Sequence, residues 1–154
     1  MQLSADQLAH VLQVWPVARL GTLHPGGTPQ LVPIVFVAEG SLIYTPIDGK
    51  PKRGDHLQRL RNVEHRRAVC VLLDHYNEDW QSLWWLRIDG EADVLAHDGA
   101  TADEFLRVER MLRAKYSQYA TVDAFRAQPT MLRVTPGWHV AWSARPMEWS
   151  ALAR

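Results

Sequence analysis

Residues 42–62 read LIYTPIDGKPKRGDHLQRLRN and pass from one kind of structure to another within a few positions. The apolar run from Leu42 to Thr45 is typical of a strand. Two prolines and a glycine then break regular structure over residues 45–53. Apolar residues three apart between Asp55 and Asn62 predict a short helix. The sequence therefore predicts a strand that leads through a stiff loop into a helix.

This loop carries three cationic side chains, Lys50, Lys52 and Arg53. Cations on a stiff loop, beside the free N–H groups at a helix start, suit a phosphate group. Each charge-assisted hydrogen bond would contribute about 1.5–3 kcal/mol. A solvated basic loop is the alternative, because lysine is common on protein surfaces. The residues alone leave both interpretations open.

The chain before the loop predicts a helix followed by strands. Ser4 and Gln7 form a capping-box pattern, and Pro16 ends the helix that follows. The expected elements are a helix over 5–14 and strands over 17–23, 30–37 and 42–45. Turn residues separate these strands, so we expect them to form an antiparallel meander.

The chain after the loop predicts further strands and a longer helix. Gly90 lies inside a strand pattern and indicates a bulge or bend. Thr101 and Glu104 form a second capping-box pattern, and Pro136-Gly137 indicates a turn between two final strands. The expected elements are helices over 55–62 and 101–115, a helical turn over 122–127, and strands over 68–76, 83–95, 131–135 and 138–143. Many short strands in one chain favour a barrel over a parallel sheet.

Composition limits the classes of function. The chain has 154 residues, which favours one domain over residues 1–154, and its 17 basic residues balance 17 acidic ones. A net charge of zero argues against a general partner of nucleic acid or of a membrane surface. We find no apolar run of about 18 residues and no secretory signal, so we expect a cytoplasmic protein. Cys70 is the single cysteine, and we expect no metal site.

The charges are unevenly distributed along the chain. Residues 50–67 hold seven basic and two acidic side chains, whereas residues 74–93 hold six acidic side chains and one arginine. Opposed blocks of this kind meet twice in a symmetric dimer. Two independently solvated faces are the alternative.

The order of the elements and five short strings carry a resemblance to a known family. The strings are VPI (32–34), KPKR (50–53), LLDHY (72–76), LWWLR (83–87) and WSA (142–144). With them, residues 8–144 resemble the flavin-binding split-barrel superfamily, which includes pyridoxamine 5′-phosphate oxidase. The chain looks most similar to the branch of oxidoreductases that depend on the deazaflavin coenzyme F420.

The resemblance implies a mainly β (α+β) fold, a six- to seven-stranded antiparallel split barrel with a few flanking helices. It also implies a homodimer with cofactor sites at the subunit interface. In this picture Pro33 and Ile34 lie against the ring of the cofactor, and Thr45 lies near it. The phosphate would be held by the basic loop, that is, by Lys50, Lys52 and the adjoining Arg53. Many relatives have arginine where this chain has Lys50, and lysine offers a point charge in place of a bidentate fork.

The function implied is hydride transfer from coenzyme F420 to a small, planar or conjugated substrate. An FMN-dependent oxidoreductase of the same fold is the first alternative. A non-enzymatic flavin- or haem-binding protein is the second, with His75 or His139 as the axial ligand of a haem. Because the cofactor performs the redox step, no catalytic side chain is assigned. His75, Tyr76 and His139 are candidate proton donors, with structural roles as the alternative.

Overall fold

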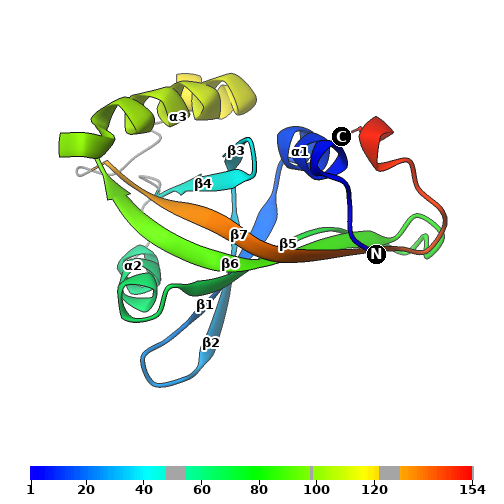
Figure 1. Ribbon diagram of the computed structural model, residues 1–154, viewed down its shortest axis with the longest axis horizontal. Helices are drawn as coiled ribbons and strands as arrows, with labels where there is room; N and C mark the ends of the chain where they lie inside the picture. Colours follow the sequence, from blue (N-terminus) through cyan, green and yellow to red (C-terminus); the bar gives the residue numbers. More distant parts are fainter. Residues whose placement is uncertain (48–54, 98, 122–128, 154) are drawn as a thin grey trace.

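The computed structural model describes residues 1–47, 55–97, 99–121 and 129–153. In this part of the chain, seven strands form one antiparallel sheet with the order β2-β1-β5-β6-β7-β4-β3, and three α-helices surround it (Figure 1). The strands are β1 (Ala18–Leu23), β2 (Pro29–Ile34), β3 (Val37–Glu39), β4 (Leu42–Pro46), β5 (Ala68–His75), β6 (Trp84–Ala96) and β7 (Thr130–Ser143). The α-helices are α1 (Ala5–Val14), α2 (Asp55–His65) and α3 (Ala102–Lys115). The expected α+β split barrel is confirmed.

Local signals fix the first helix as expected. Ser4 Oγ accepts a hydrogen bond from the Gln7 N–H at 3.2 Å, and Gln7 Oε1 accepts one from the Ser4 N–H at 3.0 Å. This capping box satisfies N–H groups that have no partner inside the helix. Leu8, Val11 and Leu12 form the buried face of α1.

The predicted three-strand meander is wrong. β1 pairs with β2, whereas β3 and β4 form a hairpin at the opposite edge of the sheet. The chain crosses between the two pairs at Phe36, whose N–H donates to Tyr116 Oη at 3.0 Å. The same hydroxyl lies 2.6 Å from the Phe36 carbonyl oxygen. A contact between residues far apart in the sequence thus holds the crossing, and no local pattern reveals it.

The end of the sheet also differs from the expectation. Residues 130–143 form one strand, β7, in place of two strands around a turn at Pro136-Gly137. β7 pairs with β6 along its length, and the register shifts between Asp89 and Gly90. A Cβ at Gly90 would collide with the carbonyl oxygen of Thr135, so glycine is needed where the two backbones approach. The predicted irregularity at Gly90 is confirmed.

The second capping box does not form. The Thr101 side chain makes no cap hydrogen bond. Glu104 instead accepts hydrogen bonds from Tyr44 Oη at 2.7 Å and from Arg133 at 3.1 Å, and so ties α3 to β4 and β7. Burial, and after it the bond to Glu104, raise the pKa of Tyr44. The helical turn expected over 122–127 lies outside the described residues.

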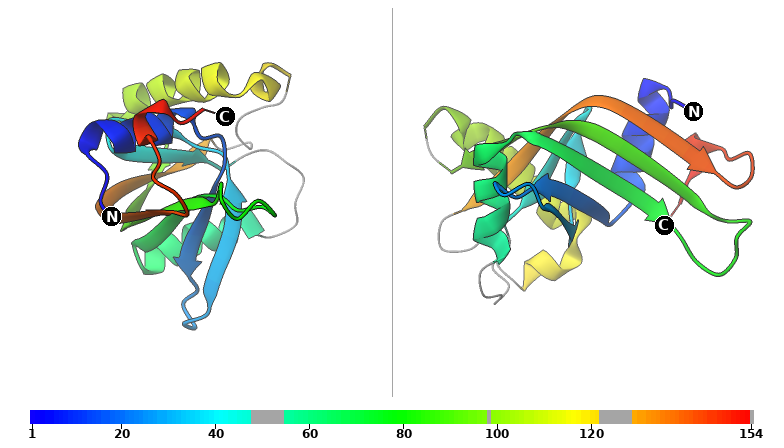
Figure 2. Two further views of the ribbon diagram at one scale, coloured as in Figure 1. Left: turned by 90° about the vertical axis from the view of Figure 1, so that its right-hand side faces the viewer. Right: turned by 90° about the horizontal axis from the view of Figure 1, so that it is seen from below.

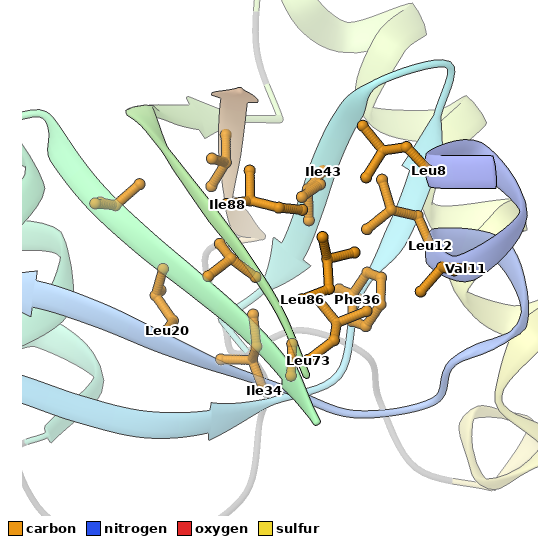
Figure 3. Close-up of a cluster of buried hydrophobic side chains, with 14 of the residues drawn as sticks. Leu8, Val11, Leu12, Leu20, Ile34, Phe36, Ile43, Leu73, Leu86 and Ile88 are labelled. Carbon is orange, nitrogen blue, oxygen red and sulfur yellow. The ribbon is translucent and has the colours of Figure 1, made fainter. Parts of the chain in front are cut away.

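The buried side chains form two clusters on either side of the curved sheet. The larger cluster fills the space between the sheet and α1, and includes Leu20, Ile43, Leu73 and Leu86 (Figure 3). The smaller one packs α3 against β3, β4 and β7. The sheet is strongly curved, and the β1–β2 hairpin projects away from the two helices α1 and α3 (Figure 2). No helix among the described residues is long and apolar enough to cross a membrane.

Candidate functional site

An open groove of about 580 Å3 lies on the outer face of the sheet. Its walls come from β1, β2, β5 and β6, and they are mostly apolar. The lining residues are Gly21, Thr22, Leu23, Pro29, Gln30, Leu31, Ala68, Val69, Cys70, Asp89 and Gly90. Concave apolar surfaces with a few polar groups are where small ligands and cofactors bind.

Gly21 keeps the floor of this groove free of side-chain atoms. Residues along β1 alternate between buried and partly exposed, and Gly21 belongs to the outward set. A Cβ at Gly21 would meet Cys70 at 3.5 Å and Leu31 at 3.7 Å, which are ordinary contacts. The fold of the single chain therefore does not demand glycine at this position, and its main effect is to leave space.

A buried hydrogen-bond network lies beneath one side of the groove. Asn62 is fully buried, and its Nδ2 donates to Thr22 Oγ1 at 2.9 Å and to Gln30 Oε1 at 2.6 Å. Its Oδ1 accepts from Gln58 Nε2 at 2.9 Å. These bonds fix the side-chain amide of Gln30, whose Nε2 has no acceptor among the described residues. This network thus holds the β1–β2 pair against α2 on the face of the sheet opposite the groove.

The free edge of β2 offers a second polar element, made of backbone. β2 lies at one edge of the sheet, and Pro29 and Pro33 have no N–H to give to β1. In an antiparallel pair, hydrogen-bonded and non-hydrogen-bonded residues alternate, so Leu31 shares the orientation of the two prolines. The Leu31 N–H is therefore the single donor that residues 29–33 direct to the free edge. The carbonyl groups of the same residues lie on either side of it.

The side chains at this edge are apolar and exposed. Leu31 is 65% exposed, and Pro29 and Pro33 are also exposed. Prolines on an edge strand prevent another strand from pairing along it. A short apolar shelf with one N–H donor is therefore better suited to a flat ligand than to a further strand.

The residues that the resemblance assigns to the cofactor lie in different environments. Pro33 is exposed on β2, whereas its neighbour Ile34 is 5% exposed and belongs to the larger core cluster. Thr45 is 1% exposed and shares its side of β4 with Ile43. Lys50, Lys52 and Arg53 lie outside the described residues. Of this set, Pro33 is the one whose side chain the described structure leaves open to a ligand.

Cys70 lines the groove and is not part of the core. Burial, and after it the Asp89 carboxylate, raise the pKa of the Cys70 thiol from 9.0 to about 11. A thiol with this pKa stays protonated near neutral pH and is a poor nucleophile. Cys70 therefore lines the groove with its thiol protonated.

The candidate histidines have structural partners. His139 Nε2 lies 3.1 Å from the backbone nitrogen of Leu3 and, in one tautomer, accepts a hydrogen bond from its N–H. His75 Nε2 lies 2.7 Å from Asn77 Nδ2, and its ring packs edge-on against Trp15. Neither histidine lines the groove. The described structure also holds no cluster of three His, Cys, Asp or Glu side chains able to bind a metal ion.

Sequence reasoning missed Gln30, Asn62 and the edge of β2. Two prolines four residues apart within a strand pattern were the available signal, because proline in a strand indicates a free edge. Asn62 gave no such signal, since its three partners come from separate elements.

Comparison with known proteins places this geometry in context. A profile of the pyridoxamine 5′-phosphate oxidase family matches residues 4–138. No curated protein sequence matches the chain. Among solved structures, a conserved hypothetical protein of Mycobacterium tuberculosis is similar with a TM-score of 0.73 and 17% identity, covering 94% of this chain and 88% of the other.

Two further structures carry descriptions of their ligands. A FAD-binding protein of Mesorhizobium loti is similar with a TM-score of 0.65 and 19% identity, covering 90% of this chain and 94% of the other. A protein described as an F420 reductase is similar with a TM-score of 0.61 and 20% identity, covering 84% of this chain and 93% of the other. At these identities the likeness shows the fold.

Proposed function

The chain belongs to the pyridoxamine 5′-phosphate oxidase family, and on this premise we propose that it is a homodimeric oxidoreductase with a flavin-type cofactor. The cofactor proposed is coenzyme F420, and the substrate is a small, planar or conjugated molecule that accepts a hydride. One observation carries the proposal: the free edge of β2 presents a single N–H donor on an exposed apolar shelf. FMN is the alternative cofactor, because the same edge suits its ring equally well.

The edge of β2 fits the polar rim of a flavin or deazaflavin ring. That rim carries an imide, in which an N–H lies between two carbonyl groups. The N–H and C=O of Leu31 point the same way, so they match a ring carbonyl and the ring N–H. Apolar contact with Leu31 and Pro33 would cover the face of the ring. The described residues thus fit the group proposed.

The basic loop supplies the other end of the cofactor site in this proposal. Lys50, Lys52 and Arg53 follow β4, which the hydrogen bond from the Ile47 N–H to the Thr130 carbonyl holds against the start of β7. Support for a phosphate contact comes from the sequence of the loop and from membership of the family.

When bound, the cofactor supplies the hydride chemistry. The chain supplies binding, orientation and exclusion of water. The Leu31 N–H acts as an oriented donor at the free edge of β2. Cys70 lines the groove with its thiol protonated, and we assign it no role as a nucleophile. A haem-binding function is less well supported, because His75 and His139 already have the partners described above.

A homodimer would cover apolar side chains that a single chain leaves open. Trp138 and Trp142 on β7 are 46% and 42% exposed, and they share the outer face with Arg87 and Trp85 of β6. Leu31 extends the same face on β2. Large exposed aromatic patches are typical of interfaces. When the same patch on two copies of a chain meets across a two-fold axis, the result is a symmetric dimer.

The test replaces the proposed donor without changing the sheet. Leu31→Pro removes one N–H that faces the free edge, and β2 already accepts proline at two positions of the same orientation. We expect this variant to bind coenzyme F420 or FMN about tenfold more weakly, as expected for one lost hydrogen bond. Leu31→Ala keeps the N–H and is the matched control for the loss of the side chain.

Cofactor-free protein is titrated with coenzyme F420 and FMN in parallel, with ligand and tryptophan fluorescence as readouts. Tight binding of the deazaflavin alone supports the proposal, and tight binding of FMN alone selects the alternative. If wild-type protein binds neither, the proposed function is wrong. If Leu31→Pro binds as well as Leu31→Ala, the ring lies elsewhere.

A further inference from the structure

A second concave surface, the α1–α3 pocket, lies between the helices α1 and α3. Its volume is about 340 Å3, and its lining residues are Gln13, Val37, Ala38, Met111, Ala114 and Lys115. Sites for small molecules occupy about 300–1,000 Å3 and are mostly apolar, with a few polar groups that orient the ligand. This pocket shares no lining residue with the groove on the outer face of the sheet, so it is a separate candidate site.

The free edge of β3 borders the α1–α3 pocket. β3 is the last strand of the sheet, and both α1 and α3 contact it (Figure 1). Gly40, with a φ of 60°, begins the two-residue turn that joins β3 to β4. Glu39 and Leu42 close this turn as a hydrogen-bonded pair, so the next pair, Ala38 and Ile43, directs its backbone groups outward. The N–H and C=O of Ala38 therefore point to the free edge.

Lys115 places a positive charge in the same pocket. Its Nζ donates to the Leu12 carbonyl oxygen at 3.0 Å and lies 4.1 Å from the centroid of the Phe36 ring. A cation is attracted to the face of an aromatic ring, and the attraction is stronger where water is excluded. Phe36 is fully buried and directly precedes β3. These two contacts fix the ammonium group beside the start of β3.

The acidic side chain at the other end of β3 is compensated within the chain. The Glu39 carboxylate accepts hydrogen bonds from Arg107 at 2.6 and 2.8 Å, and these bonds hold the pKa of Glu39 below its usual value. Val37, Met111 and Ala114 supply the apolar part of the lining. Methionine adapts its shape to a ligand more readily than branched side chains do. The α1–α3 pocket thus combines a fixed cation with an apolar wall.

We propose that the α1–α3 pocket binds a small organic acid, with its carboxylate beside Lys115 Nζ and the Ala38 N–H and its apolar body along α3. Ammonium and backbone N–H groups are the donors that carboxylates accept from most strongly. β3 is three residues long and directs the backbone groups of Ala38 alone to its free edge, so it gives a peptide strand little to pair with. The ligand is therefore a small molecule. This site is independent of the proposed cofactor and goes beyond the proposed function.

The first test compares octanoate, octan-1-ol and octylamine, which share an alkyl chain and differ in the head group. Isothermal titration calorimetry of the full chain is expected to show octanoate binding about tenfold more tightly than octan-1-ol, the effect of one charge-assisted contact. Octylamine should bind more weakly than octan-1-ol, because it carries the same charge as Lys115. Equal affinities for octanoate and octan-1-ol, or no binding of octanoate, would overturn the proposal.

The second test locates the bound carboxylate with variants of α3. Lys115→Gln is expected to weaken octanoate binding about tenfold and to leave octan-1-ol binding unchanged, whereas Lys115→Arg keeps the charge and most of the affinity. Arg110→Gln is the matched control, since it removes an exposed cation from the same helix, outside the pocket. If Lys115→Gln and Arg110→Gln bind octanoate equally well, the carboxylate does not lie at Lys115 and the proposal is wrong.

A third test fills the pocket and leaves its charge in place. It decides the question even if Lys115→Gln fails to fold, because Lys115 also holds the Leu12 carbonyl of α1. Ala114 lines the pocket and is exposed, so a larger side chain is tolerated there.

Ala114→Phe is expected to weaken binding of both octanoate and octan-1-ol by about tenfold or more, because its ring occupies the space of the alkyl chain. Leu106→Phe, at an exposed position of α3 outside the pocket, is the control and binds as wild type. Circular dichroism verifies the fold of both variants. Unchanged octanoate binding by folded Ala114→Phe would place the acid elsewhere on the chain and overturn the proposal.

Discussion

Asn62 is a single side chain on which the arrangement beside the groove depends. Asn62→Ala would remove the buried amide to which the side chains of Thr22, Gln30 and Gln58 are all hydrogen-bonded. We expect the free energy of unfolding to fall by about 1–3 kcal/mol, since unsatisfied buried groups keep their desolvation cost. Urea unfolding followed by tryptophan fluorescence measures this. Gln58→Ala is the control, because it removes one bond and leaves the donors of Asn62 satisfied. Equal stability of the two variants would contradict this role for Asn62.

Cys70 gives a prediction about pH. Its thiol has a pKa of about 11 in the folded chain and 9.0 as a free group. The folded state therefore binds this proton more tightly than the unfolded state, and its contribution to stability is lost as the pH rises from about 9 through about 11. We expect alkylation of the native protein by iodoacetamide to be slow at pH 8 and to rise with a midpoint near pH 11. A midpoint at or below the free value of 9.0 would contradict the burial of this thiol.

Gly90 on β6 and Gly21 on β1 differ in what their missing side chains allow, because Gly90 lets two strands approach and Gly21 leaves space in the groove. Gly90→Ala forces a Cβ against the Thr135 carbonyl where β6 and β7 approach. We expect it to lower the free energy of unfolding by about 1–3 kcal/mol, as overpacking does. Gly21→Ala makes ordinary contacts and should leave stability within about 0.5 kcal/mol while it narrows the groove. Thermal unfolding and cofactor titration of both variants test the pair. A stability loss at Gly21 equal to that at Gly90 would refute the distinction.

The elements that sequence reasoning predicted well are those fixed by near neighbours. α1 has its expected bounds because Ser4 and Gln7 satisfy each other within one turn. The prediction of two strands in place of β7 is wrong, because Pro136-Gly137 is a turn signal when the sequence is considered alone. In the folded chain the same residues lie opposite the bulge at Gly90, a partner far away in the sequence. The meander failed for the same physical reason, since Tyr116 determines where the chain crosses at Phe36.

In the candidate site, too, the features that depend on neighbouring residues could be predicted from the sequence, and those that depend on distant partners could not. The basic loop was visible as a run of charge, and the resemblance extended it to Pro33, Ile34 and Thr45. Pro33 is exposed, whereas Thr45 is 1% exposed. The difference depends on which face of the sheet each side chain lies on, and that follows from the pairing of the strands, which the sequence alone does not give. The orientation of the Gln30 side chain could not be predicted from the sequence, because it depends on a helix residue, Asn62.

At the scale of the whole molecule, the proposed dimer depends on the outer face of the sheet. Trp142 on that face and Leu106 on α3 are both 42% exposed, so they form a matched pair. Trp142→Asp places a charge in the proposed interface, where burial without a partner is costly, and we expect it to convert the dimer to a folded monomer. Leu106→Asp should leave the dimer intact. Sedimentation velocity gives the mass of each variant, and circular dichroism verifies the fold.

The same pair of variants connects assembly to cofactor binding. If each site needs both subunits, Trp142→Asp loses affinity for the cofactor together with its partner, and raising the protein concentration recovers both in parallel. Leu106→Asp binds as wild type at every concentration. A Trp142→Asp monomer that binds the cofactor as tightly as the wild-type dimer would show that the β2 edge and the basic loop of one chain suffice. In that case the exposed tryptophans would serve assembly alone.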